Sequence, residues 1–222
     1  MTSIILFAPL VGALACGFGW RLIGEAAATW LATALLFLAA VLSWAVFLGF
    51  DGQTQHVQIL RWIESGTLTS DWAIRLDRLT AIMLVMVPLA CLCIFIYAIG
   101  YMAHDPRQAR FFSLISLFAG AMLTLVVADN LLLLFVGWEI MGLCSFMLIG
   151  FWYEKPSAYK AAVKAFTTTR VADVIMLLGI AYLYFTTGTL SFREILYNEE
   201  VLSALAQTPA IIFGGISAAS LI

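Results

Sequence analysis

Six long apolar stretches constrain this chain more than any other feature of its sequence. They cover residues 4–20, 26–50, 79–102, 111–128, 131–152 and 161–185. A helix needs about 20 mainly apolar residues to cross a hydrocarbon core of about 30 Å. Strands of a membrane barrel would be about half as long and would alternate in polarity. The sequence therefore predicts an all-α membrane protein, a bundle of about six transmembrane helices, because a helix in lipid satisfies its own backbone hydrogen bonds.

The composition supports this prediction. Hydrophobic residues make up 64% of the chain and charged residues 11%, whereas soluble domains are about half apolar and about a quarter charged. We expect lipid or other membrane subunits to cover the excess apolar surface. No basic tract of the kind that binds nucleic acid is present in the sequence.

The two ends of the chain carry two further expectations. No Lys or Arg precedes the first stretch and Arg21 follows it, which is the reverse of a cleavable signal, so we expect a retained first span. A seventh apolar stretch, 209–222, is too short to cross a membrane and ends without a polar flank. We therefore expect the chain to be the first part of a longer polypeptide, with a truncated seventh helix.

The polar connections predict the arrangement outside the membrane. The segment 51–78 combines glycines, Ser/Thr residues and charges with scattered apolar residues, which predicts a short amphipathic piece or a hairpin on the membrane surface. Six Lys and Arg residues lie on the side of the loops that follow spans one, three and five, and four lie on the other side. Because positive residues favour the cytoplasmic side, we expect the N-terminus to lie outside.

The sequence predicts no metal-binding, cofactor-binding or catalytic residues. Its cysteines form no C-x-x-C pair, and its two histidines, His56 and His104, lie in polar connections. Iron–sulfur and zinc sites need clustered thiolates or imidazoles. No glycine-rich nucleotide motif is present in the sequence either. We expect the chain itself to do no redox chemistry and any work it does to be the movement of ions.

Charged residues within the apolar stretches are the candidate site. Glu139 lies near the middle of span five, and Arg170 and Asp173 lie three residues apart in span six. An ionisable residue inside a membrane is costly and is a functional candidate by default, here as a proton relay. The alternatives are a protonated Glu139 bonded to a neighbouring helix and a purely structural Arg170–Asp173 ion pair. Lys164 is a further relay candidate, whereas we expect Lys160 to reach the membrane interface.

Several segments resemble one protein family. Residues 128–153 read ADNLLLLFVGWEIMGLCSFMLIGFWY and residues 164–173 read KAFTTTRVAD, and the segments 72–80, 100–102 and 110–112 fit as well. This pattern is similar to the largest antiporter-like membrane subunit of respiratory NADH:quinone oxidoreductase (complex I), called chain 5 in mitochondria and chain L in bacteria. The resemblance covers essentially the whole chain.

The resemblance implies a fold and a role for the candidate site. Subunits of this family contain roughly fourteen to sixteen helices, with two inverted repeats that each form a half-channel. Residues 1–110 would then hold the first three helices with a surface loop at 51–78, and residues 111–222 would begin the first repeat. Glu139 would be the glutamate of the first half-channel, with Arg170, Asp173 and Lys164 near it. Its expected partner, a lysine in a Gly-Lys-Ser-Ala motif, would lie beyond Ile222.

The resemblance also implies partners and location. The chain would belong to the membrane arm of a complex that couples electron transfer to proton translocation, in a bacterial plasma membrane or a mitochondrial inner membrane. NADH, flavin, iron–sulfur clusters and quinone would be bound by partner subunits, with none in this chain. Three alternatives stay open: the large subunit of a multisubunit Na⁺/H⁺ antiporter or a related ion-coupled complex, a structural membrane subunit, and a fragment without activity of its own.

Overall fold

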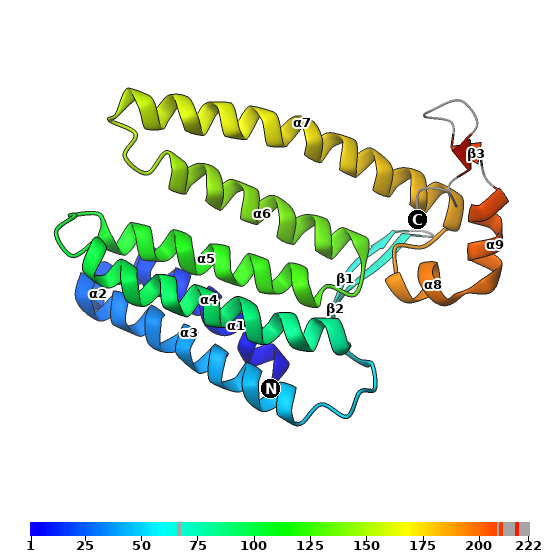
Figure 1. Cartoon of the computed structure of the whole chain (residues 1–222), viewed down its shortest axis with the longest axis horizontal. Helices are drawn as coiled ribbons and strands as arrows, with labels where there is room; N and C mark the ends of the chain where they lie inside the picture. Colours follow the sequence, from blue (N-terminus) through cyan, green and yellow to red (C-terminus); the bar gives the residue numbers. More distant parts are fainter. Residues whose placement is uncertain (66–67, 208, 211–215, 218–222) are drawn as a thin grey trace.

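The computed structural model describes residues 1–65, 68–207, 209–210 and 216–217. Its main body consists of six long helical segments, and consecutive segments run in opposite directions (Figure 1). Their bounds are Thr2–Ile23, made up of α1 (Thr2–Leu14), a π-helical turn η1 (Ala15–Gly19) and α2 (Trp20–Ile23), followed by α3 (Glu25–Leu48), α4 (Arg78–Tyr101), α5 (Gln108–Val127), α6 (Leu131–Ile149) and α7 (Pro156–Thr187). Each is long and apolar enough to cross a membrane, which confirms the six predicted spans.

The last span starts earlier than the sequence analysis placed it. We expected the helix over 161–185, and α7 covers Pro156–Thr187. Pro156 occupies the first turn, where a proline needs no hydrogen-bond donor and already has a helical φ angle. Lys160, which precedes the predicted bounds by one residue, therefore lies within the helix together with Lys164.

The helices end at two opposite faces of the molecule, which we call the hairpin end and the loop end. The hairpin end holds the N-terminus and the strands β1 (Gln55–Ser65) and β2 (Leu68–Leu76), together with the short helices α8 (Phe192–Tyr197) and α9 (Glu199–Gln207). The loop end holds α2 and the connections 102–107 and 150–155 (Figure 1, left).

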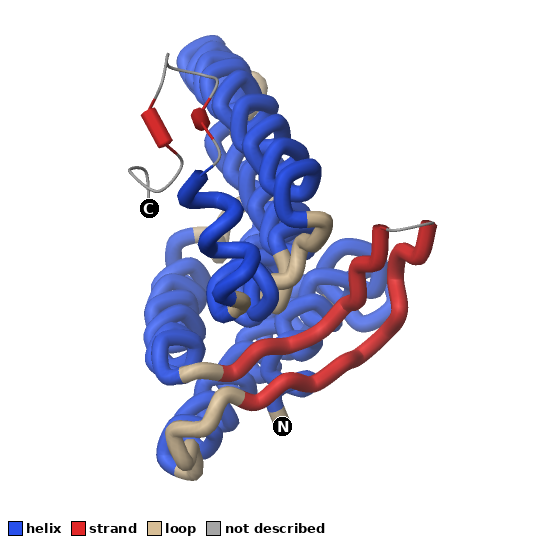
Figure 2. The backbone as a smooth tube through the Cα atoms, turned by 90° about the vertical axis from the view of Figure 1, so that its right-hand side faces the viewer, coloured by secondary structure: helices blue, strands red, loops and turns tan. Residues whose placement is uncertain are grey.

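The segment 51–78 forms a hairpin, which is one of the two arrangements that the sequence predicts. β1 and β2 pair antiparallel, with irregularities near Ile59 and Trp62. Figure 2 shows the two strands running side by side across this end of the helices. Ile74 and Leu76 are buried against Ile5 of α1, so the hairpin is anchored to the bundle by apolar contacts.

The core lies among α1, α3, α4 and α5. One buried cluster lies toward the hairpin end and includes Leu84 and Leu123. A second buried cluster includes Leu36, Phe95 and Phe112. The rings of Phe95 and Phe112 meet edge to face, with their centres 5.5 Å apart. α6 packs on α5, and α7 packs on α6 (Figure 1). Most α7 side chains are exposed in the isolated chain, so this helix needs lipid or other protein around it.

The predicted seventh helix, 209–222, lies mainly outside the described residues. Within it the structure describes only the short paired strands β3 (Pro209–Ala210) and β4 (Ile216–Ser217). The expected lysine partner beyond Ile222 lies outside the sequence altogether.

Candidate functional site

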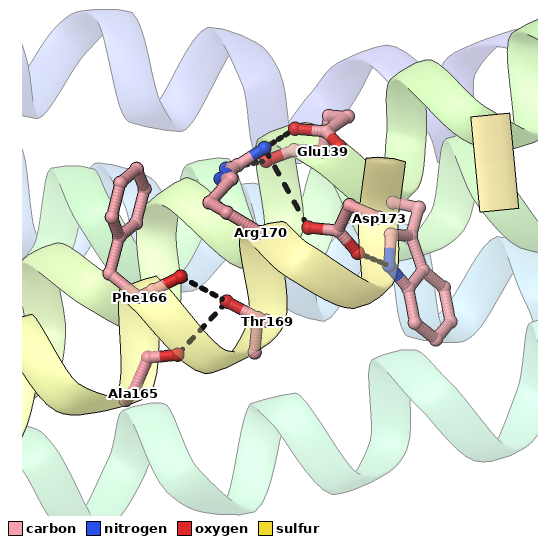
Figure 3. A network of polar contacts seen from close by, with 7 residues as sticks. Glu139, Ala165, Phe166, Thr169, Arg170 and Asp173 are labelled. Atoms are coloured by element: carbon pink, nitrogen blue, oxygen red, sulfur yellow. Dashed lines mark hydrogen bonds and ion pairs between the residues drawn. The ribbon is translucent and has the colours of Figure 1, made fainter. Parts of the chain in front are cut away.

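The middle of α6 and the middle of α7 bring three charged side chains together (Figure 3). Nη1 of Arg170 forms an ion pair with Oε2 of Glu139 and lies 3.7 Å from Oδ2 of Asp173. Its Nη2 lies 3.5 Å from the main-chain carbonyl oxygen of Glu139. One guanidinium group is therefore shared between two carboxylates, and we call these three residues the charged cluster.

Two aromatic side chains hold the charged cluster in place. The indole N–H of Trp138 donates a hydrogen bond to Oδ1 of Asp173 over 2.9 Å. The guanidinium carbon of Arg170 lies 4.9 Å from the centre of the Phe166 ring, a cation–π distance. The sequence analysis gave no role to Trp138 or Phe166. Aromatic residues are common in membrane helices, so neither residue stands out in the sequence. The contact of Trp138 with Asp173 becomes visible only when α6 packs on α7.

The position of Glu139 follows from how α6 begins. Asn130 caps the helix, because its Oδ1 accepts a hydrogen bond from the backbone N–H of Leu133 over 2.8 Å. Its Nδ2 donates to the carbonyl oxygen of Asp71 in β2 over 2.7 Å. The turn that precedes α6 also contacts the connection between α7 and α8, because the N–H of Leu131 donates to the carbonyl oxygen of Leu190. Three segments thus fix the start of α6, and with it the depth of Glu139.

Close packing of α6 on α5 fixes the same helix from its other side. A Cβ atom on Gly137 would lie 3.1 Å from the backbone nitrogen of Leu125 and 3.2 Å from the carbonyl oxygen of Ala121. Such contacts are too short for most side chains. Gly137 therefore allows the close approach of α6 to α5.

Lys164 lies apart from the charged cluster. It is exposed on α7, and in the part of the chain that the structure describes no carboxylate oxygen lies within 4 Å of its ammonium group. The 3.6-residue period places Lys164 and Asp173 on opposite faces of α7. The structure thus brings together three of the four predicted relay residues, and a relay role for Lys164 stays a prediction.

The charged cluster holds two carboxylates for one guanidinium group. With all three groups ionised, two carboxylates face one guanidinium, and the cluster carries one net negative charge. Asp173 is buried, with 8% of its side chain exposed, and about a quarter of the Glu139 side chain is exposed. A net charge in a low-dielectric interior is unfavourable, so a proton on Glu139 or a second cation beside it would balance the cluster.

A groove of about 250 Å³ between α6 and α7 leads to the cluster. It is lined mostly by apolar side chains such as Met141 and Phe146, and it reaches Asp173 and Thr169. The Thr169 hydroxyl donates within its own helix, to the carbonyl oxygens of Ala165 and Phe166 (Figure 3). Asp173 is the charged side chain that lines this groove, beside the hydroxyl groups of Ser145 and Thr169.

A second group of polar residues lies at the hairpin end. Asp129 lies in the turn between α5 and α6 with 18% of its side chain exposed, and its Oδ1 is 3.1 Å from Nδ1 of His56. The pair lines a cavity of about 340 Å³ with Asp71 and Glu194. Among the described residues, no group of three or more His, Cys, Asp or Glu side chains is placed to hold a metal ion.

Two family models match this sequence. The model described as NADH:quinone oxidoreductase/Mrp antiporter, transmembrane, matches residues 128–220, which include the whole charged cluster. The model described as NADH-ubiquinone oxidoreductase (complex I), chain 5 N-terminus, matches residues 62–112. The two matches cover different parts of the chain, and both descriptions name NADH:quinone oxidoreductase subunits.

The curated proteins most similar to this chain include further subunits of this kind. The chain is 52% identical to NADH-quinone oxidoreductase subunit L of Rhodobacter capsulatus over 91% of this chain and 30% of that protein. It is 41% identical to subunit L of Mycobacterium tuberculosis over 87% of this chain and 31% of the relative. It is 38% identical to NAD(P)H-quinone oxidoreductase chain 5 of a Synechocystis species over 84% of this chain and 28% of the relative. The chain thus spans about a third of the length of these relatives.

One solved structure shares the fold. A chain from the membrane-bound sulfane sulfur reductase, an archaeal respiratory membrane complex, superposes with a TM-score of 0.71. The two chains are 20% identical over 86% of this chain and 29% of that one. At this identity the likeness concerns the arrangement of the helices alone.

Proposed function

Because the chain belongs to the family of antiporter-like membrane subunits that includes chain 5 and subunit L of NADH:quinone oxidoreductases, we propose that it contributes a proton half-channel to the membrane arm of such a complex. Electron transfer from NADH to quinone would take place in partner subunits that hold the flavin, the iron–sulfur clusters and the quinone. This chain would contribute a path for protons and no redox group.

The observation that carries the proposal is the sharing of Arg170 between two carboxylates inside two membrane spans. A purely structural ion pair needs one carboxylate for each guanidinium group. The second carboxylate leaves the charged cluster with an uncompensated negative charge, which makes it responsive to the charge of its surroundings.

The mechanism follows from electrostatics. When no further cation is near, a proton on Glu139 would leave Arg170 to the ionised Asp173, because a carboxyl group in a low-dielectric site favours its neutral form. When a cation approaches from a neighbouring helix, the ionised form of Glu139 is favoured and its proton leaves. Trp138 supports the cycle, because its hydrogen bond keeps Asp173 in place beside Arg170.

The named relatives favour the respiratory complex over the stand-alone antiporter. Membership is tested on a native gel of solubilised membranes, with the chain tagged at its N-terminus and the lanes stained for NADH-driven dye reduction. The proposal expects the tag in one large stained band. A smaller, unstained assembly would contradict the respiratory assignment.

The relay role is tested separately with Glu139→Gln, measured as protons translocated per NADH oxidised in membrane vesicles. Glu154→Gln is the matched control, since Glu154 lies in the loop between α6 and α7 and 65% of its side chain is exposed. We expect the first change to lower the ratio with normal assembly and the second to leave it unchanged. A Glu139→Gln variant that loses assembly, or that assembles and pumps normally, would instead favour a structural subunit.

A further inference from the structure

A crevice at the loop end is separate from the charged cluster. It lies where η1 and α2 meet the first turn of α3 and the start of α5, and its volume is about 450 Å³. All of these segments are ends of membrane spans, so the crevice opens at the depth of lipid headgroups (Figure 1, left). Trp20 lines it, and tryptophan is enriched at this depth because its ring is apolar and its N–H is polar.

The walls of the crevice are tied together by specific contacts. The Ser113 hydroxyl of α5 donates to the carbonyl oxygen of Ala13 over 2.8 Å, and the Cys16 thiol donates to the carbonyl oxygen of Ala28 over 3.2 Å. A Cβ atom on Gly17 would lie 2.9 Å from the Ser113 hydroxyl, so η1 and α5 are in close contact there. The π-helical turn deforms the first span at this point, and such turns are frequent at functional sites.

The crevice presents charges of both signs. Arg110 is exposed at its rim, and within the described residues no carboxylate oxygen lies within 4 Å of its guanidinium group, whose recorded contact is the Tyr153 ring. Arg107 also lines the crevice but is paired with Asp105 and Glu154. Glu25, in the first turn of α3, adds one carboxylate.

From these features we infer that the crevice binds a phospholipid with a primary-amine headgroup, of the phosphatidylethanolamine type. Arg110 would donate to the phosphate, and the ammonium group of the headgroup would donate to Glu25. The apolar side chains of Trp20 and Leu114 would contact the glycerol and the upper acyl chain. A choline headgroup has no N–H to donate to Glu25, and a glycerol headgroup has no positive charge.

The test uses the protein in its native membrane complex, reconstituted with phospholipids that carry a photoactivatable acyl chain. Labelling of peptides containing residues 13–22 and 109–118 is measured relative to labelling of the lipid-exposed α4 peptide around Ile94. We expect the ethanolamine lipid to label the crevice peptides about tenfold more than the choline lipid, as a charge-assisted hydrogen bond predicts. Equal labelling by the two lipids would overturn the proposal.

Two variants and a control assign the contacts. We expect Arg110→Gln to reduce labelling by all three lipids, because each carries the phosphate. We expect Glu25→Gln to abolish the preference for ethanolamine over glycerol while glycerol-lipid labelling persists. Lys155→Gln removes a positive charge at the same end but outside the crevice, and it should change nothing. Arg110→Gln and Lys155→Gln behaving alike would contradict the proposal, as would full competition by glycerophosphoethanolamine, which has the headgroup but no acyl chain.

Discussion

At the scale of single residues, the charged cluster depends on side chains that are themselves uncharged. Trp138 binds Asp173, and Phe166 lies under the guanidinium group of Arg170. Asp173 is buried, so loss of its indole partner would leave one carboxylate oxygen with no other recorded hydrogen bond. The geometry of the cluster is therefore sensitive to changes beside it.

We predict that Trp138→Phe destabilises the protein by about 1 kcal/mol, since a hydrogen bond to a charged group contributes about 1.5–3 kcal/mol when fully buried and Trp138 is partly exposed. Unfolding by SDS in mixed micelles measures the effect. Trp30→Phe is the control, because Trp30 is an exposed tryptophan of α3 and makes no side-chain hydrogen bond among the described residues. Equal stability of the two variants would show that the indole bond contributes nothing.

A second residue-scale prediction concerns Asp105 in the α4–α5 connection. The hydrogen bond from the Trp152 indole, followed by the backbone N–H of Arg107, lowers the pKa of Asp105 below its usual 3.8. Ionised Asp105 therefore stabilises the folded state. Its contribution is fully present when the pH lies above the unfolded-state pKa, and it is lost as the pH falls through the lowered pKa of the folded state. We expect wild-type stability to fall with acid in that window, and Trp152→Phe to reduce this slope. A slope unchanged in Trp152→Phe would rule out the contact as its cause.

At the scale of elements, the six spans could be predicted from the sequence because an apolar run of about 20 residues has one stable arrangement in lipid. For residues 51–78 the sequence predicted either a short amphipathic piece or a hairpin, because the pattern of apolar residues suits both. The pairing of the strands depends on the burial of Ile74 and Leu76 against α1, which the sequence alone does not show. The Arg170–Asp173 contact could be predicted from its spacing within one helix. The contact between Trp138 and Asp173 could not, because it depends on how α6 and α7 are rotated against each other.

The α5–α6 crossing yields an element-scale prediction. Gly137→Ala would push Cβ against backbone atoms of α5, which cannot yield as a side chain can, so we expect a loss of about 1–3 kcal/mol. Gly179→Ala in α7 is the matched control, since no atom lies within 4 Å of its added Cβ, and alanine is the better helix former. SDS unfolding compares the two. A Gly137→Ala variant as stable as Gly179→Ala would contradict the close crossing.

At the scale of the whole molecule, alternation of the spans places the N-terminus, the hairpin, α8 and α9 at one end, and α2 with the connections 102–107 and 150–155 at the other. The crevice at the loop end and the charged cluster inside the bundle are thus separate in position. The charge distribution predicts that the hairpin end faces outside.

Labelling of single cysteines with a membrane-impermeant maleimide tests this orientation. We expect Glu64→Cys, in the hairpin, to react in intact cells and Glu154→Cys, in the loop end, to react only after the membrane is opened. The four native cysteines lie within the spans and should be replaced in the background. The reverse pattern would invert the orientation.

We propose that Glu139 takes up and releases a proton during turnover. Infrared difference spectroscopy of the complex before and after NADH addition observes carboxyl protonation directly, with Glu154→Gln as the control for a surface carboxyl group. We expect a carboxyl band in the wild type and in the control that is missing in assembled Glu139→Gln. A band that persists unchanged in Glu139→Gln would mean that the proton is carried by another residue.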